Sequence, residues 1–136
     1  MDAFDSDVLI DAARAVDPLG TRVARLFAGA RAGVDELVGV GSVLLITEVL
    51  IKPLRQSDAD EAADLRFLLS RLDLHPVDAD TARVAVALGA TYGLAMADAV
   101  HLATAVLAGA GRFITKNRRD FTKSITEIDV TYPDEL

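Results

Sequence analysis

The stretch ADAVHLATAVLAGAGRFIT, residues 97–115, places a helix directly before a strand. Alanine and leucine dominate residues 97–107, and both favour helix. Glycines at positions 109 and 111 then favour the end of that helix. Residues 112–115 follow with aromatic and β-branched side chains, which are typical of a strand. The stretch therefore predicts one helix–strand unit of an α/β fold.

The same alternation extends through the rest of the chain. Apolar runs predict a brief strand ending at Asp5 and further strands within 37–46, over 74–77 and over 128–132. Helical spacing predicts helices after Ser6 and over 19–30, 47–54, 58–72 and 79–92. We expect Pro53 to kink or end its helix, residues 93–96 to form a turn, and the last strand to lie at an edge. Short strands separated by helices indicate a parallel sheet with helices on both faces.

Composition limits the class of protein. A chain of 136 residues, 51% of them hydrophobic, fits one domain with a sizeable core. The absence of cysteine excludes disulfides, thiolate metal sites and a cysteine nucleophile. No apolar run approaches the roughly 20 residues that span a bilayer, and the acidic start is unlike a signal peptide. We therefore expect a soluble, cytoplasmic protein with no membrane partner.

The net charge of −7 argues against a broad basic surface for nucleic acid. The cations are nevertheless unevenly placed, because five of the 14 lie within 112–123: Arg112, Lys116, Arg118, Arg119 and Lys123. Such a cluster is usually a solvated loop, and contact with RNA phosphates is the functional alternative. A bound metal ion can attract a phosphate even to an acidic protein.

Three carboxylates stand at or near the predicted starts of helices. Asp5 ends the first strand, while Glu48 and Asp98 lie in or near the first turns of their helices. Ligands of open α/β sheets bind outside the carboxyl ends of the strands, so neighbouring strands would bring these acids together. Clustered carboxylates need a compensating cation, and oxygen ligands favour Mg²⁺ or Mn²⁺. Such an ion supports phosphodiester hydrolysis by activating water, without a serine or histidine nucleophile.

Each acid also has an ordinary structural role when it is considered alone. Asp5 can cap a helix, Glu48 can be a solvated charge, and Asp98 can be a first-turn acid favoured by the helix dipole. Asp120 can be a surface turn residue. His101 follows Asp98 by one turn, and we interpret it as a packing residue rather than a catalyst.

Four segments, in chain order, resemble the motifs of the PIN-domain family. They are DSDVLI at 5–10, ITEVL at 46–50, DAVHLATA at 98–105 and FITKNRRDF at 113–121. The third and fourth are the most specific, and together the motifs run from near one end of the chain to near the other. The resemblance implies that residues 1–136 form a single PIN domain. It also implies a three-layer α/β/α fold with a central, mainly parallel sheet of about five strands.

The resemblance implies an Mg²⁺- or Mn²⁺-dependent endoribonuclease of the VapC type, the toxin of a toxin–antitoxin pair. Such a toxin is expected to form a homodimer and to bind a small antitoxin that blocks its site. The implied metal ligands are Asp5, Glu48 and Asp98, and Asp120 joins them as a catalytic residue. The expected supporting residues are Ser6, Thr115 and Asn117, and the expected RNA contacts are Lys116, Arg118 and Arg119.

One departure concerns the fourth motif. Many family members have aspartate where this chain has Asn117, so the fourth acidic position is open between Asn117 and Asp120. With three carboxylates we expect one metal to bind firmly and a second weakly. The alternative function is a PIN-fold module that binds RNA or protein without cleavage, although the three acids are present. Dinucleotide binding is disfavoured, because Leu44 occupies the third glycine position after Gly39 and Gly41.

Overall fold

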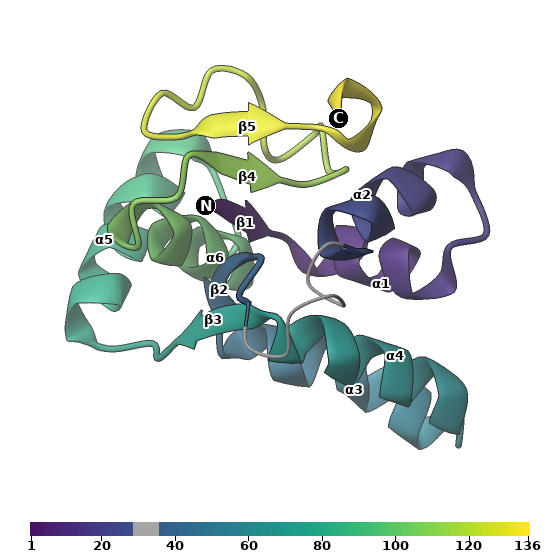
Figure 1. Ribbon diagram of the computed structural model, residues 1–136. Helices are drawn as coiled ribbons and strands as arrows, with labels where there is room; N and C mark the ends of the chain where they lie inside the picture. Colours follow the sequence, from purple (N-terminus) through teal and green to yellow (C-terminus); the bar gives the residue numbers. More distant parts are fainter. Residues whose placement is uncertain (29–35) are drawn as a thin grey trace.

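Five short strands form one sheet in which every pair is parallel. The computed structural model describes residues 1–28 and 36–136. The strands are β1 (Asp2–Phe4), β2 (Gly39–Ser42), β3 (Leu72–His75), β4 (Arg112–Ile114) and β5 (Asp129–Thr131). Their order is β3-β2-β1-β4-β5, which runs from the bottom to the top of Figure 1. The first strand is therefore central, and the last lies at an edge, as expected.

Helices cover both faces of this sheet. They are α1 (Ser6–Arg14), α2 (Pro18–Ala28), α3 (Leu44–Arg55), α4 (Ala59–Ser70), α5 (Ala79–Tyr92) and α6 (Met96–Leu107), and a short 3₁₀ helix spans Pro133–Glu135. In Figure 1, α5 and α6 lie on one side of the view and α1 to α4 on the other. The predicted three-layer α/β/α fold is confirmed, with a sheet that is entirely rather than mainly parallel.

Two buried clusters, one on each face, account for this layering. Successive strand residues point to opposite faces of a sheet. Accordingly Ala3 and Phe113 pack with α5 and α6, whereas Phe4 and Ile114 pack with the helices α1 to α4. All four of these side chains are at most 2% exposed. The central strands are therefore apolar on both faces, as parallel strands between two helical layers must be.

Several predicted boundaries shift in the structure. The helix expected over 58–72 ends at Ser70, and Leu72 instead opens β3, which spans Leu72–His75 rather than 74–77. Leu72 continues the spacing of the apolar residues of α4, so periodicity alone assigned it to the helix. Pro53 does not end α3, because it lies so near the C-terminus that the helix closes two residues later. Met96 begins α6 instead of ending a turn, and the predicted helical residue Ala30 lies outside the described residues.

No single helix of the described residues is long and apolar enough to cross a membrane. The helices α5 and α6 meet that test only when taken together, and the chain bends by 116° between them.

Candidate active site

Asp5 occupies the point where the central strand passes into α1. It caps that helix, and one carboxylate oxygen accepts the Ser6 backbone N–H at 2.8 Å. The other oxygen accepts the hydroxyl hydrogen of Thr115, also at 2.8 Å, from the residue that follows β4. The Asp5 backbone N–H donates to the carbonyl of Ile114 at 2.9 Å, which ties the two strand ends together. The carboxylate is consequently fixed in a buried position, 4% exposed.

Glu48 and Asp98 approach Asp5 from opposite layers. Glu48 lies in the second turn of α3, which follows β2, and Asp98 lies in the first turn of α6. Burial raises the pKa of Asp98, and the negative charges of Asp5, Asp120 and Glu48 raise it further. These three carboxylates therefore lie close enough to Asp98 for their charges to repel it.

The acids at the start of α1 are also difficult to ionise. Burial raises the pKa of Asp5, although the hydrogen bond from Thr115 opposes this effect. Burial and the neighbouring charge of Asp5 raise the pKa of Asp7 to about 7. Asp7 is not among the site residues expected from the sequence. Its place two residues after Asp5, on the first turn of the same helix, was the available sign that it would share the acidic surroundings.

His101 is a residue whose place in the site the sequence did not reveal. It is 3% exposed, and its Nε2 atom lies 3.0 Å from Glu48 Oε1. This is ion-pair distance without the alignment of a hydrogen bond, and neither ring nitrogen has a hydrogen-bond partner among the described residues. Burial lowers the pKa of His101, but Glu48, Asp5 and Asp98 together raise it above the ordinary value. Reciprocally, His101 lowers the pKa of Glu48, and the Ser6 hydroxyl adds to this effect.

The spacing between Asp98 and His101 in the sequence could have revealed that His101 belongs to the site. Residues three apart on a helix share a face, so His101 necessarily projects beside Asp98. The interpretation as a packing residue is correct about its burial and incomplete about its neighbours, because the side chain touches a carboxylate of the site.

The two candidates for the fourth acidic position are bonded to each other. The Asn117 amide donates to Asp120 Oδ2 at 2.9 Å, and the Asp120 backbone N–H donates to Asn117 Oδ1 at 3.2 Å. The hydrogen bond from Asn117 lowers the pKa of Asp120, so this carboxylate is ionised at neutral pH. The Asn117 backbone N–H donates to the hydroxyl oxygen of Thr115 at 3.1 Å. The loop after β4 is thereby linked to Asp5 through Thr115.

Each of the three cations expected to contact RNA has an acidic neighbour. Lys116 Nζ lies 2.7 Å from Asp11 Oδ2. Arg118 pairs with Asp134 and stacks 4.1 Å above the ring of Tyr132. Arg119 lies 3.4 Å from Asp120, and its side chain is 89% exposed. Exposed ion pairs of this kind contribute about 0–1 kcal/mol each, so they compete only weakly with a phosphate.

Asp5, Glu48 and Asp98 form what we call the acidic cluster. The oxygen atoms of these side chains are ligands that suit a hard divalent cation. All the candidate ligands are carboxylate oxygens, the type that Mg²⁺ and Mn²⁺ prefer. Burial raises the pKa of Asp5 and Asp98, whereas His101 lowers the pKa of Glu48. No three His, Asp or Glu side chains of the described residues are positioned to hold a metal ion. Metal binding would therefore require these side chains to turn toward the ion.

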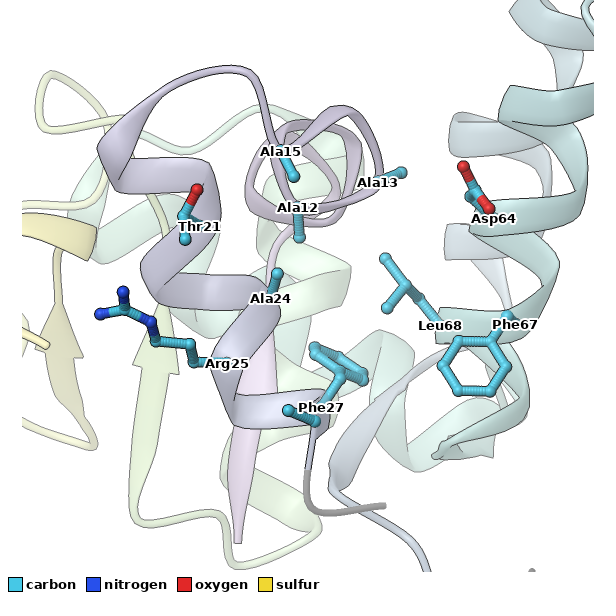
Figure 2. A pocket seen from close by; sticks show the side chains of 11 residues that line it. Ala12, Ala13, Ala15, Thr21, Ala24, Arg25, Phe27, Asp64, Phe67 and Leu68 are labelled. Carbon is cyan, nitrogen blue, oxygen red and sulfur yellow. The ribbon is translucent and has the colours of Figure 1, made fainter. Parts of the chain in front are cut away.

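A pocket away from this cluster lies between α1, α2 and α4 (Figure 2). Its volume is about 350 Å³, and it shares no lining residue with the acidic cluster. Alanines of α1 and α2 form much of its wall, and the larger apolar groups are Phe27, Phe67 and Leu68. Arg25 and Asp64 also line it. The pocket is therefore an apolar recess with charged residues among its lining.

The model of the PIN domain family matches residues 3–124, which include all four motif segments. The chain belongs to the PIN domain family. This family consists of nucleases, and the acidic cluster of this PIN domain lies at the motif residues. A search of curated proteins finds no match.

Two solved structures resemble this PIN domain over nearly its whole length. A toxin–antitoxin complex from Klebsiella pneumoniae contains a chain that is 26% identical, with a TM-score of 0.74 and complete coverage of both chains. The VapBC2 complex from Rickettsia felis, bound to a DNA fragment from its promoter, gives 14% identity and a TM-score of 0.71. The alignment with the second covers 96% of this chain and 97% of the other.

Proposed function

We propose that this PIN domain, residues 1–136, is an Mg²⁺- or Mn²⁺-dependent endoribonuclease. The observation that carries the proposal is the match of the PIN domain family over residues 3–124, whose motif segments hold Asp5, Glu48, Asp98 and Asp120. Burial raises the pKa of Asp98, and the charges of the other three acids raise it further. Acids from four separate segments thus meet at the edge of the sheet where parallel α/β folds bind ligands. This concentration of charge costs stability, and a cation-dependent activity accounts for it.

Asp5, Glu48 and Asp98 would hold the cation. When bound there, a divalent ion polarises a phosphoryl oxygen and lowers the pKa of an attacking water. The Thr115 hydroxyl keeps Asp5 oriented, and His101 holds Glu48 from the buried side. Asp120 stays ionised because Asn117 donates to it, so Asp120 can accept a hydrogen bond from water or from a ribose hydroxyl.

The test is cleavage of RNA in Mn²⁺ by the parent and by the Asp5→Asn and Asp98→Asn variants. We expect both variants to lose activity while keeping the circular-dichroism spectrum of the parent, and EDTA to abolish parent activity. Asp60→Asn, at an exposed acid in the first turn of α4, is the matched control and should remain active. Full activity of both site variants, or activity in EDTA, would contradict the proposal. Binding of RNA without cleavage by the parent would favour the non-catalytic alternative.

We also propose that the domain acts in the cytoplasm as a VapC-type toxin with a small antitoxin partner. Both structural neighbours come from toxin–antitoxin complexes, and one of them aligns over its full length. The pocket of Figure 2 supports the proposal, because an apolar recess between helices suits the apolar face of a partner helix. The partner would be encoded by the neighbouring reading frame.

Co-expression with the product of that reading frame tests this proposal. We expect a stable complex whose formation suppresses RNA cleavage. Ala24→Trp, which fills the pocket, should weaken the complex, whereas Ala82→Trp on the exposed side of α5 should not. Undiminished cleavage in the presence of the co-expressed protein would contradict the assignment as a toxin.

A further inference from the structure

A second pocket, lined by both charged and apolar residues, opens beside the acidic cluster, between α1 and α3. It encloses about 240 Å³, and we call it the α1–α3 pocket. Glu48 and Asp7 line it, so it is continuous with the candidate active site. Ile10, Val49 and Pro53 contribute apolar lining, and the last two are buried. The pocket thus joins an apolar wall to the site where the scissile phosphate would lie.

Lys52 extends this pocket away from Glu48 along α3. The two residues are four apart, so they share a helix face and are separated by about 6 Å along the helix axis. Both line the pocket, and Lys52 is exposed. A single helix therefore presents an acid suited to a metal ion and, one turn later, a cation suited to a phosphate.

The other charges of the pocket already have partners. Arg14 lies 3.4 Å from Glu61, and Lys116 lies 2.7 Å from Asp11. Lys52 differs, because within residues 1–28 and 36–136 its side chain has no hydrogen bond or ion pair.

The remaining two carboxylates belong to the acidic end of the pocket. Glu48 contacts His101 at 3.0 Å, and Asp7 accepts the Lys116 backbone N–H at 3.4 Å. The unpaired positive charge therefore lies at the end of the pocket away from the acidic cluster, and an anion there would meet Lys52 first.

We propose that the α1–α3 pocket binds the RNA phosphate that flanks the scissile one, with Lys52 as its contact. This subsite rests on the proposed ribonuclease function, since only a polyanion that reaches Glu48 would extend one turn further to Lys52. The ribose between the two phosphates would lie against the apolar wall of Val49 and Pro53. A lysine that contacts phosphate adds affinity without reading the sequence of bases.

The experiment measures binding of a short, labelled, single-stranded RNA of mixed sequence across a range of salt concentrations. The Asp98→Asn variant serves as the background, so that cleavage does not interfere. One phosphate contact in a single strand contributes about 0.7 to the slope of log affinity against log salt. Lys52→Ala should reduce the slope by about that amount and weaken binding about fivefold near 0.1 M salt.

Two matched variants separate the local contact from general effects. Lys52→Arg keeps the charge and should bind like the background protein. Arg55→Ala removes a cation from the same helix but outside the pocket, and should leave affinity and slope unchanged. In the cleaving parent, Lys52→Ala should raise KM while kcat stays unchanged, as expected for binding energy that is equal in the ground and transition states.

Equal effects of Lys52→Ala and Arg55→Ala would overturn the subsite, as would the absence of RNA binding by the background protein. Failure of the parent to cleave RNA in Mn²⁺ would instead overturn the nuclease proposal. The salt slope would then still decide whether Lys52 contacts RNA, so the two failures are distinguishable.

Discussion

At the scale of single residues, His101 lies buried against the acids of the candidate site. Its imidazole is buried 3.0 Å from Glu48, and three carboxylates raise its pKa. A protonated His101 would offset part of the repulsion that a metal ion is proposed to offset. The imidazole and the metal thus stabilise the same carboxylates. Removal of the imidazole should therefore make the stability of the protein depend more strongly on the metal.

We therefore expect His101→Gln to destabilise the metal-free protein. The loss should be on the order of 1–3 kcal/mol, because Glu48 keeps its partly buried charge without a partner. Thermal denaturation in EDTA should show a lower Tm than the parent, and added Mn²⁺ should raise the variant's Tm by more than the parent's. An identical Mn²⁺ shift in both proteins would show that His101 does not compensate the cluster.

Asp7 makes stability depend on pH. Its pKa is about 7 in the folded protein and 3.8 ordinarily, so between these values the folded chain binds a proton that the unfolded chain has lost. The contribution of Asp7 therefore favours folding at low pH, and it is lost as the pH rises from about 4 to about 7. Urea unfolding in EDTA should show Asp7→Asn gaining stability relative to the parent at pH 8, and little at pH 4. If the free energy of unfolding differed between Asp7→Asn and the parent by the same amount at pH 4 and at pH 8, the raised pKa of Asp7 would be contradicted.

Part of this site could be predicted from the sequence for a definite reason. Asp5 follows a strand, and α/β topology sends such residues to the carboxyl edge of the sheet, so the place of Asp5 was predictable. Contacts that depend on side-chain packing were not. The approach of His101 to Glu48 requires the relative placement of α6 and α3, which lie far apart in the chain. The choice of Asn117 or Asp120 also depended on loop geometry, and the structure bonds the two together.

At the scale of elements, two helices illustrate what periodicity can and cannot predict. The exact bounds of α5 were predicted, because Asp78 caps it and Gly93 ends it in the left-handed conformation, with a φ of 69°. The end of α4 was predicted at Leu72 rather than at Ser70, because an apolar residue at position 72 fits a helix and a strand equally well. The chain leaves the helix at Arg71, and Leu72 becomes buried in β3. Tertiary packing, rather than local sequence, fixes that boundary.

Close packing of α1 against α2 gives an element-scale prediction. A Cβ atom at Gly20 would lie 2.5 Å from the backbone oxygen of Asp11, a distance that real side chains do not tolerate. Alanine favours helix over glycine by about 1 kcal/mol, yet Gly20→Ala should be destabilising by about 1–3 kcal/mol because the two helices must separate. Urea denaturation measures the change.

Gly111→Ala is the control for that experiment. The nearest atom to a Cβ at Gly111 is a backbone oxygen 4.0 Å away, and its φ is not positive, so little change is expected. A Gly20→Ala protein as stable as the parent, or more stable, would show that helix propensity outweighs the contact.

At the scale of the whole molecule, α3 divides its surface among three tasks. Leu45, Val49 and Pro53 are buried against the core. Glu48 and Lys52 line the α1–α3 pocket. Ile46 and Leu54 lie on a further face, and they are 42% and 53% exposed. These two exposed apolar side chains are available to a partner, and their face is separate from both the core and the pocket.

We propose that this face of α3 forms the interface of a homodimer. A second copy would cover Ile46 and Leu54 while leaving the α1–α3 pocket of each copy open to RNA. Sedimentation should show a dimer for the parent and a monomer for the double variant Ile46→Glu/Leu54→Glu, because two charges on each copy would face their equivalents. Val86→Glu, at a position on α5 that is 72% exposed, should remain dimeric. A parent that sediments as a monomer would exclude the interface, and a double variant that stays dimeric would place it elsewhere.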